Sequence, residues 1–197
     1  MQSQGFPGPA WPSAQPGRQR RWLWLVLVIA LPLLLCVLSV CSIRVTFQTF
    51  QVGGPAMQPA LSAGDEVLVN TLAYAFSGPS RGDVIVFHYP RDPKQEFIKR
   101  VLAIPGDTIK EDVDQIWVNG VLLHEPYIAQ PLNPQLFIIT LKANEYFVAG
   151  DNRPFSSDSR TWGPVPSNYI IGKAVYVTGP KDVGFISTYP DVFSAIK

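Results

Sequence analysis

Residues 115–123 read QIWVNGVLL, two short apolar runs separated by Asn119 and Gly120. An Asn-Gly pair between apolar runs is a strong β-hairpin signal, because both residues accept the positive φ angles of a type I′ turn. Similar runs, rich in β-branched and aromatic residues, recur at 45–52, 66–70, 83–88, 145–149 and 170–177. Glycine and proline punctuate them, and no long amphipathic helical pattern follows residue 44. The sequence therefore predicts a mainly β domain of short strands over residues 45–197.

Composition excludes several classes of function. The 197-residue chain has a formal net charge of +1, so neither a nucleic acid nor an acidic substrate is indicated as a partner. Both cysteines, Cys36 and Cys41, lie in an apolar N-terminal run, which leaves no disulfide and no thiol nucleophile for the rest of the chain. His88 and His124 lack metal-ligand spacing, so we expect no zinc, no other metal, no cofactor and no Ser-His-Asp triad.

The N-terminal part divides into a tail and an apolar run. Residues 1–17 are rich in Pro, Gly, Gln and Ser, and we expect a disordered cytoplasmic tail over residues 1–21. Residues 22–41 read WLWLVLVIALPLLLCVLSVC and carry no charge. As a helix this run would be roughly 30 Å long, which matches the hydrocarbon core of a bilayer. Arginines cluster before it and only Arg44 follows closely, which predicts a single-pass anchor with its N-terminus in the cytoplasm.

Other interpretations of the run are less favoured. A cleavable signal peptide would have a shorter apolar region and a small-x-small exit. A lipid-modified Cys41 is conceivable, but Val40 is bulkier than such sites usually allow. A buried helix of a soluble protein would show a polar face, and Ser39 is the only hydrophilic side chain here. We therefore expect the lipid bilayer as a partner, with the β domain outside the cytoplasm.

A second segment, FIKRVLAI at residues 97–104, places two cations side by side. In a strand, Lys99 and Arg100 point to opposite faces, so one of them would lie among apolar side chains. Lysine is the better candidate for functional burial, because desolvation lowers its pKa and the neutral amine can take a proton from a hydroxyl. The alternative is that both side chains pack their stems and keep their charged ends in water.

A third segment, GDNRPFSSDSR at residues 150–160, combines four charged side chains with three serines and cannot be an apolar core element. One interpretation is a solvated loop with an exposed ion pair between Asp158 and Arg160, which would stabilise little. The other is a tight, hydrogen-bonded turn that presents Ser156 towards Lys99.

Together with VGGPAMQPAL at residues 52–61, these segments resemble the signature boxes of bacterial type I signal peptidases. The resemblance covers most of the chain after residue 21 and includes GDEVLVN (64–70), RGDVIVF (81–87), IKRVLAIPGD (98–107) and WVNG (117–120). It implies a signal-peptidase-like β-rich fold with a small inserted β subdomain at about 108–145. It also implies location in the bacterial cell membrane and signal peptides of secretory preproteins as partners.

The resemblance assigns a role to each matching residue. Lys99 matches the general base of a Ser/Lys dyad, and Ser156 matches the serine that orients that lysine. Six further positions match supporting residues: Gly54 in the oxyanion hole, Met57 beside the nucleophile, Asp158 and Arg160 as an ion pair, and Asp151 and Arg153 in the same box. Ala60 stands where the family frequently has Thr, and Thr71 stands where it frequently has Lys. Both departures from the family pattern look like ordinary variation.

The position of the nucleophilic serine is occupied by Ala56. A methyl group has no lone pair with which to attack, so the chain as written is expected to bind signal peptides without cleaving them. Rescue by Ser62 or Ser156 is disfavoured by their positions. Three hypotheses remain: a serine endopeptidase whose nucleophile has been replaced, which we favour; a natural pseudoenzyme that binds signal peptides; and a membrane-anchored β domain with a scaffolding role.

Overall fold

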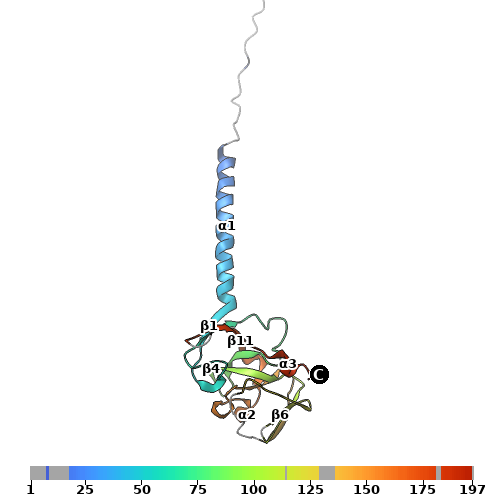
Figure 1. Ribbon diagram of the computed structural model, residues 1–197. Helices are drawn as coiled ribbons and strands as arrows, with labels where there is room; N and C mark the ends of the chain where they lie inside the picture. The colour runs from blue at the N-terminus through green and yellow to red at the C-terminus, as the bar shows by residue number, and fades with distance from the viewer. Residues whose placement is uncertain (1–7, 9–17, 114, 129–135, 181–182, 197) are drawn as a thin grey trace, which may run out of the picture. The chain divides into compact units, whose positions relative to one another are not determined.

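The computed structural model describes residues 8, 18–113, 115–128, 136–180 and 183–196. The chain divides into two compact units, residues 1–43 and 44–197. Helix α1 (Arg18–Thr46) contains residues 22–41 and continues through Pro32 (Figure 1). It also contains residues 18–21, which we had assigned to the tail; the rest of the tail, except residue 8, lies outside the described residues. A search of the described residues finds no helix with the length and apolarity needed to cross a membrane.

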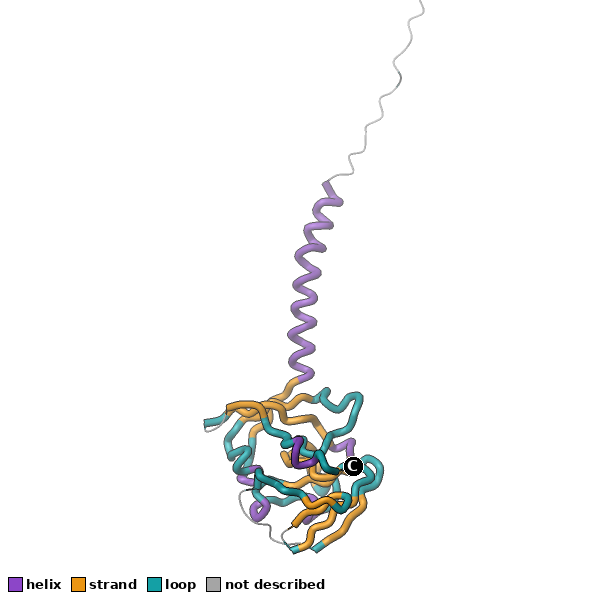
Figure 2. The backbone as a smooth tube through the Cα atoms, turned by 45° about the vertical axis from the view of Figure 1, so that its right-hand side comes forward, coloured by secondary structure: helices purple, strands orange, loops and turns teal. Residues whose placement is uncertain are grey.

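The larger antiparallel sheet of the second unit has the order β1-β2-β11-β3-β4-β9-β10, and β12 also pairs with β11. Figure 2 shows the strands in orange. Its strands are β1 (Phe47–Gln51), β2 (Glu66–Asn70), β3 (Val84–Tyr89), β4 (Asp92–Ala103), β9 (Glu145–Ala149), β10 (Val165–Pro166), β11 (Ile170–Thr178) and β12 (Val183–Phe185). The mainly β prediction is confirmed. The first strand starts at Phe47 and not at residue 45, because α1 continues to Thr46.

A smaller antiparallel sheet lies in the chain between β4 and β9. It has the order β7-β6-β5-β8 and contains β5 (Thr108–Asp112), β6 (Gln115–Val118), β7 (Val121–Leu122) and β8 (Phe137–Thr140). The predicted hairpin joins β6 to β7, with φ angles of 51° at Asn119 and 79° at Gly120. These positive angles explain why an Asn-Gly pair stands at this turn.

Short helical segments connect the strands: η1 (Pro55–Met57), η2 (Arg153–Phe155), α2 (Ser159–Trp162), η3 (Ser167–Tyr169) and α3 (Pro190–Phe193). The core lies on both faces of the larger sheet. β3 is paired on both sides, by β11 and β4, and residues 84–87 are all fully or almost fully buried. This double burial explains why DVIVFH reads as a continuous apolar run and not as an alternating one.

Candidate functional site

Three of the sequence boxes meet at a cavity of about 320 Å³. One wall comes from β1 and η1 and includes Gly54, Ala56 and Met57; the other comes from β4 and includes Lys99. Four of the predicted site positions therefore line a single cavity. Most of the remaining side chains in the lining are apolar. They come from Phe50, Val52, Phe97 and Ile98; the rest of the lining is Gly53 and the polar residues Glu96 and Ser157.

The segment that carries Ala56 is held by the loop at residues 150–160. Asn152 donates a backbone hydrogen bond to the Ala56 carbonyl and a side-chain hydrogen bond to the Pro55 carbonyl, both at 3.0 Å. Sequence reasoning did not single out Asn152 as a site residue. Its double contact with η1 shows that the position of residue 56 depends on the loop, although almost one hundred residues separate the two in sequence.

Lys99 is buried in this cavity wall, with 5% of its surface exposed. Its Nζ donates to the Ile98 carbonyl at 3.1 Å and lies 5.3 Å from the centre of the Phe97 ring. Burial lowers the pKa of Lys99 to about 8, although the carboxylates of Asp158 and Asp151 oppose the shift. The amine is thus partly neutral near neutral pH, which is the property that a general base requires.

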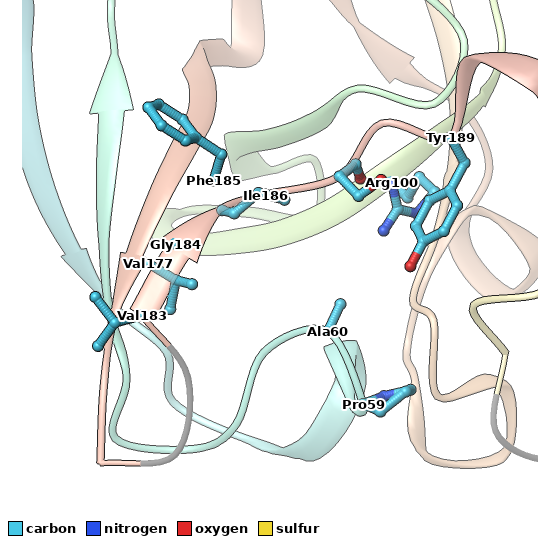
Figure 3. A pocket seen from close by; sticks show the side chains of 10 residues that line it. Pro59, Ala60, Arg100, Val177, Val183, Gly184, Phe185, Ile186 and Tyr189 are labelled. Atoms are coloured by element: carbon cyan, nitrogen blue, oxygen red, sulfur yellow. Dashed lines mark hydrogen bonds between the residues drawn. The ribbon is translucent and has the colours of Figure 1, made fainter.

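Arg100, on the opposite face of β4, is also buried and has 0% exposure. Its Nε and Nη2 donate to Asp151 at 2.8 and 2.7 Å, and its Nη1 donates to the carbonyls of Gly82 and Ser187. Figure 3 shows its guanidinium beside Tyr189, in the wall of a second cavity of about 300 Å³. The alternative in which both cations keep their charged ends in water is therefore wrong, because Asp151 and two carbonyls replace the water around Arg100.

The ion pair between Asp158 and Arg160 is buried, with side chains 0% and 3% exposed. Arg160 donates its Nε and Nη2 to Asp158 at 2.8 and 2.9 Å, and the Gly150 amide donates to the same carboxylate at 3.1 Å. Burial alone would raise the pKa of Asp158, but the hydrogen bond and charge of Arg160 hold it below its usual value, with help from the Gly150 amide. The exposed-loop interpretation of this segment is therefore excluded.

Ser156 lies beside the backbone of Gly150. A methyl group on Gly150 would collide with the Ser156 hydroxyl and with the Ala56 carbonyl, so these three residues are in close contact. Within the described chain, the buried Ser156 Oγ makes no hydrogen bond of standard geometry. The structure thus brings Ser156 next to residue 56 but shows no bond from it to Lys99.

Arg153 is fully buried at the start of η2. Its Nε donates to the Gly150 carbonyl at 2.8 Å, and its terminal nitrogens bind Glu125 at 2.6 and 3.0 Å. Glu125 was not among the predicted site residues. The only sequence signal for it is its isolation, since it is the single charged side chain between residues 115 and 135. Among the described residues, no group of three or more His, Cys, Asp and Glu side chains could hold a metal ion.

The site thus combines an amine of lowered pKa, the Ala56 methyl group and an apolar cavity lining. Comparison with known proteins shows which family the chain resembles. A family model described as signal peptidase, peptidase S26, matches residues 21–178. A protein named signal peptidase I from Leptolyngbya laminosa is 40% identical over 127 residues, which cover 61% of this chain and 63% of that protein. The matched region is thus less than two thirds of that relative's length.

Two further comparisons differ in how much of the chain they cover. Signal peptidase I of Bacillus caldolyticus is 36% identical over 171 residues, which cover 79% of this chain and 88% of that protein. A crystal structure of a signal peptidase I from Enterococcus faecalis V583 is 36% identical and covers 48% of this chain and 95% of its own, with a TM-score of 0.44.

Proposed function

Because the chain belongs to the peptidase S26 family of signal peptidases, we propose that it binds the signal peptides of secretory preproteins in the cavity lined by Ala56 and Lys99. The observation that carries the proposal is the meeting of these two residues in one cavity. Its apolar lining, including Val52, Met57 and Ile98, suits the small apolar side chains that precede a signal-peptide cleavage point.

As written, the chain binds without cleaving. In a serine endopeptidase of this kind, the serine hydroxyl attacks the scissile carbonyl while the lysine amine takes its proton, and an acyl-enzyme forms. The Ala56 methyl supplies neither the attacking lone pair nor the proton. Loss of the nucleophile leaves only binding and oxyanion stabilisation, worth roughly 10³–10⁴ over water in serine proteases.

The supporting residues act on this site through position. In this proposal Lys99 serves as the general base when a hydroxyl is present at residue 56, and Ser156, which lies beside Gly150, orients the lysine. Gly54 has an extended backbone next to η1, with φ −165° and ψ −178°, and lines the cavity on the side expected for an oxyanion hole. The buried pairs Asp151–Arg100 and Asp158–Arg160 hold the loop that carries Ser156.

We also propose that residues 22–41 anchor the protein in the bacterial cell membrane, with residues 44–197 outside the cytoplasm. The support is the uncharged apolar sequence, its location within the continuous helix α1, and the arginines that precede it. In that arrangement the site would work at the membrane surface, where secretory preproteins emerge.

One experiment tests the function directly. A detergent-solubilised preprotein is incubated with the unsubstituted chain, with Ala56→Ser, and with Ala56→Ser combined with Lys99→Ala. Cleavage by Ala56→Ser alone supports a signal peptidase whose nucleophile has been replaced. Failure of Ala56→Ser to cleave, despite binding by every version, would favour a natural pseudoenzyme. Absence of binding in all versions would instead support a scaffolding role.

A further inference from the structure

The chain segment after β7 carries a carboxylate that is buried against the site loop. Both terminal nitrogens of Arg153 donate to Glu125, at 3.0 and 2.6 Å, and the two side chains are 0% and 4% exposed. The Tyr127 hydroxyl donates to the same carboxylate at 2.5 Å. Glu125 therefore accepts from two partners at once, and both hold it in one orientation.

The same segment also contacts the second buried arginine. The ring of Tyr127 lies 4.5 Å from the guanidinium carbon of Arg100, a distance suited to a cation–π interaction. Arg100 binds Asp151 near the start of the loop, and Arg153 binds the Gly150 carbonyl next to it. Residues 125–127 thus contact both of the arginines that hold the first turn of the loop.

Three buried arginines around the loop are matched by three carboxylates only when Glu125 is present. Asp151 pairs with Arg100, and Asp158 is already bound to Arg160. Burial alone would lower the pKa of Arg153, but the charge and hydrogen bonds of Glu125 raise it above its usual value. Without that carboxylate, Arg153 would be a buried cation with no dedicated partner, which is strongly unfavourable.

We propose that Glu125 and Tyr127 are positioning residues, which fix the loop at 150–160 and thereby set the geometry between Lys99 and residue 56. The link is direct, because Asn152 of this loop binds the carbonyls of Pro55 and Ala56. The proposal rests on the proposed function, since it concerns the same site. It assigns the role to a segment of the inserted part of the chain, outside the sequence boxes.

The first test uses the full chain in detergent micelles with Ala56 unchanged. NMR titration of the Lys99 side chain is compared in the unsubstituted chain, Glu125→Gln and Tyr127→Phe. If the loop loosens, water reaches Lys99 and its pKa rises from about 8 towards that of a free lysine, because burial is the largest influence on it. Movement of Asp151 and Asp158 away from Lys99 opposes this rise but is the smaller influence.

Asp112→Asn is the matched control. It removes one carboxylate from the same inserted sheet, but Asp112 pairs with Lys110 at the surface and does not contact the loop. This variant should leave the pKa of Lys99 unchanged. Tyr127→Phe keeps the ring over Arg100 and removes only the hydroxyl. If Glu125→Gln does not fold, Tyr127→Phe therefore tests the positioning role by itself. An unchanged pKa of Lys99 in the folded variant would overturn the proposal.

The second test uses cleavage by the Ala56→Ser chain. Adding Glu125→Gln should lower kcat by about tenfold or more with little change in KM, because Glu125 does not line the cavity. An unchanged kcat would also overturn the proposal. If Ala56→Ser itself fails to cleave, the hypothesis of a peptidase whose nucleophile has been replaced is refuted, and the Lys99 titration still decides the role of Glu125.

Discussion

Lys99 and Arg100 are neighbours in β4, and their side chains enter two different buried environments on opposite faces of the strand. Lys99 lines the cavity beside Ala56, whereas Arg100 is bound by Asp151. Both environments are closed by the loop at residues 150–160, which supplies Asp151 to one and lies beside the other. β4 and this loop therefore hold two buried cations. The charge of Arg100 is paired with Asp151, whereas burial disfavours the charge of Lys99.

The burial of Lys99 predicts that this lysine destabilises the folded protein at neutral pH. Its pKa is about 8 in the folded chain and 10.5 as a free side chain, so the unfolded state binds more protons between these values and stability rises with pH in that window. The difference corresponds to about 3 kcal/mol. Lys99→Met should therefore raise the free energy of unfolding at pH 7 by up to this amount, with the gain vanishing near pH 10.5.

Denaturant unfolding at pH 7 and pH 10.5 measures this effect. Lys94→Met is the control, because Lys94 is exposed on the same strand and should show no pH-dependent gain. Equal effects of the two substitutions at both pH values would show that Lys99 does not carry a desolvation penalty.

The buried pair of Arg100 and Asp151 predicts a large cost for removing one partner. Asp151→Asn leaves Arg100 as an uncompensated buried cation and should reduce the free energy of unfolding by about 3–5 kcal/mol. Asp112→Asn, which breaks the exposed pair with Lys110, should cost no more than about 1 kcal/mol. Urea denaturation of the two variants compares them, and similar losses would contradict the importance of the buried pair.

Gly150→Ala is predicted to distort the site. The added methyl would meet the Ser156 side chain and the backbone carbonyl of Ala56, and a backbone atom cannot move aside as a flexible side chain can. We expect a loss of about 1–3 kcal/mol in stability and weaker signal-peptide binding. Gly184→Ala is the control, because its methyl would have no neighbour within 4 Å. Near-native stability and binding of Gly150→Ala would contradict the packing described for this loop.

Asp158 is predicted to make the protein sensitive to acid. Its pKa is lowered in the folded chain, so its contribution to stability is complete above the unfolded value of about 3.9 and is lost as the pH falls through the folded value. Asp158→Asn should therefore be less stable at pH 7 and show a flatter loss of stability below about pH 4. Unfolding curves between pH 2 and 7 measure the slope of stability against pH, and a slope equal to that of the unsubstituted chain would exclude Asp158 as its source.

Local sequence signals predicted the hairpin at Asn119 and Gly120, because turn conformation depends on the residues of the turn itself. Strand alternation likewise separated Lys99 from Arg100. What the sequence did not reveal are partners brought together by the fold. Arg100 and Asp151 are 51 residues apart, and Glu125 and Arg153 are 28 apart. No periodicity links such positions, so a buried arginine and an isolated acid look like surface charges until the strands are paired.

The last prediction concerns the pH dependence of cleavage by Ala56→Ser. The lysine must be neutral to accept the serine proton, so kcat/KM should rise with pH and level off above the pKa of Lys99, which is about 8. A free lysine, with a pKa of 10.5, would place this rise more than two pH units higher, so the position of the rise reports burial of the base. Cleavage of a signal-peptide substrate between pH 6 and 10 measures it. The Ala56→Ser chain carrying Lys99→Ala should be inactive throughout, and Ala56→Ser with Lys94→Met should keep the same profile. A rate that does not change over this range would mean that proton transfer to Lys99 does not limit the reaction.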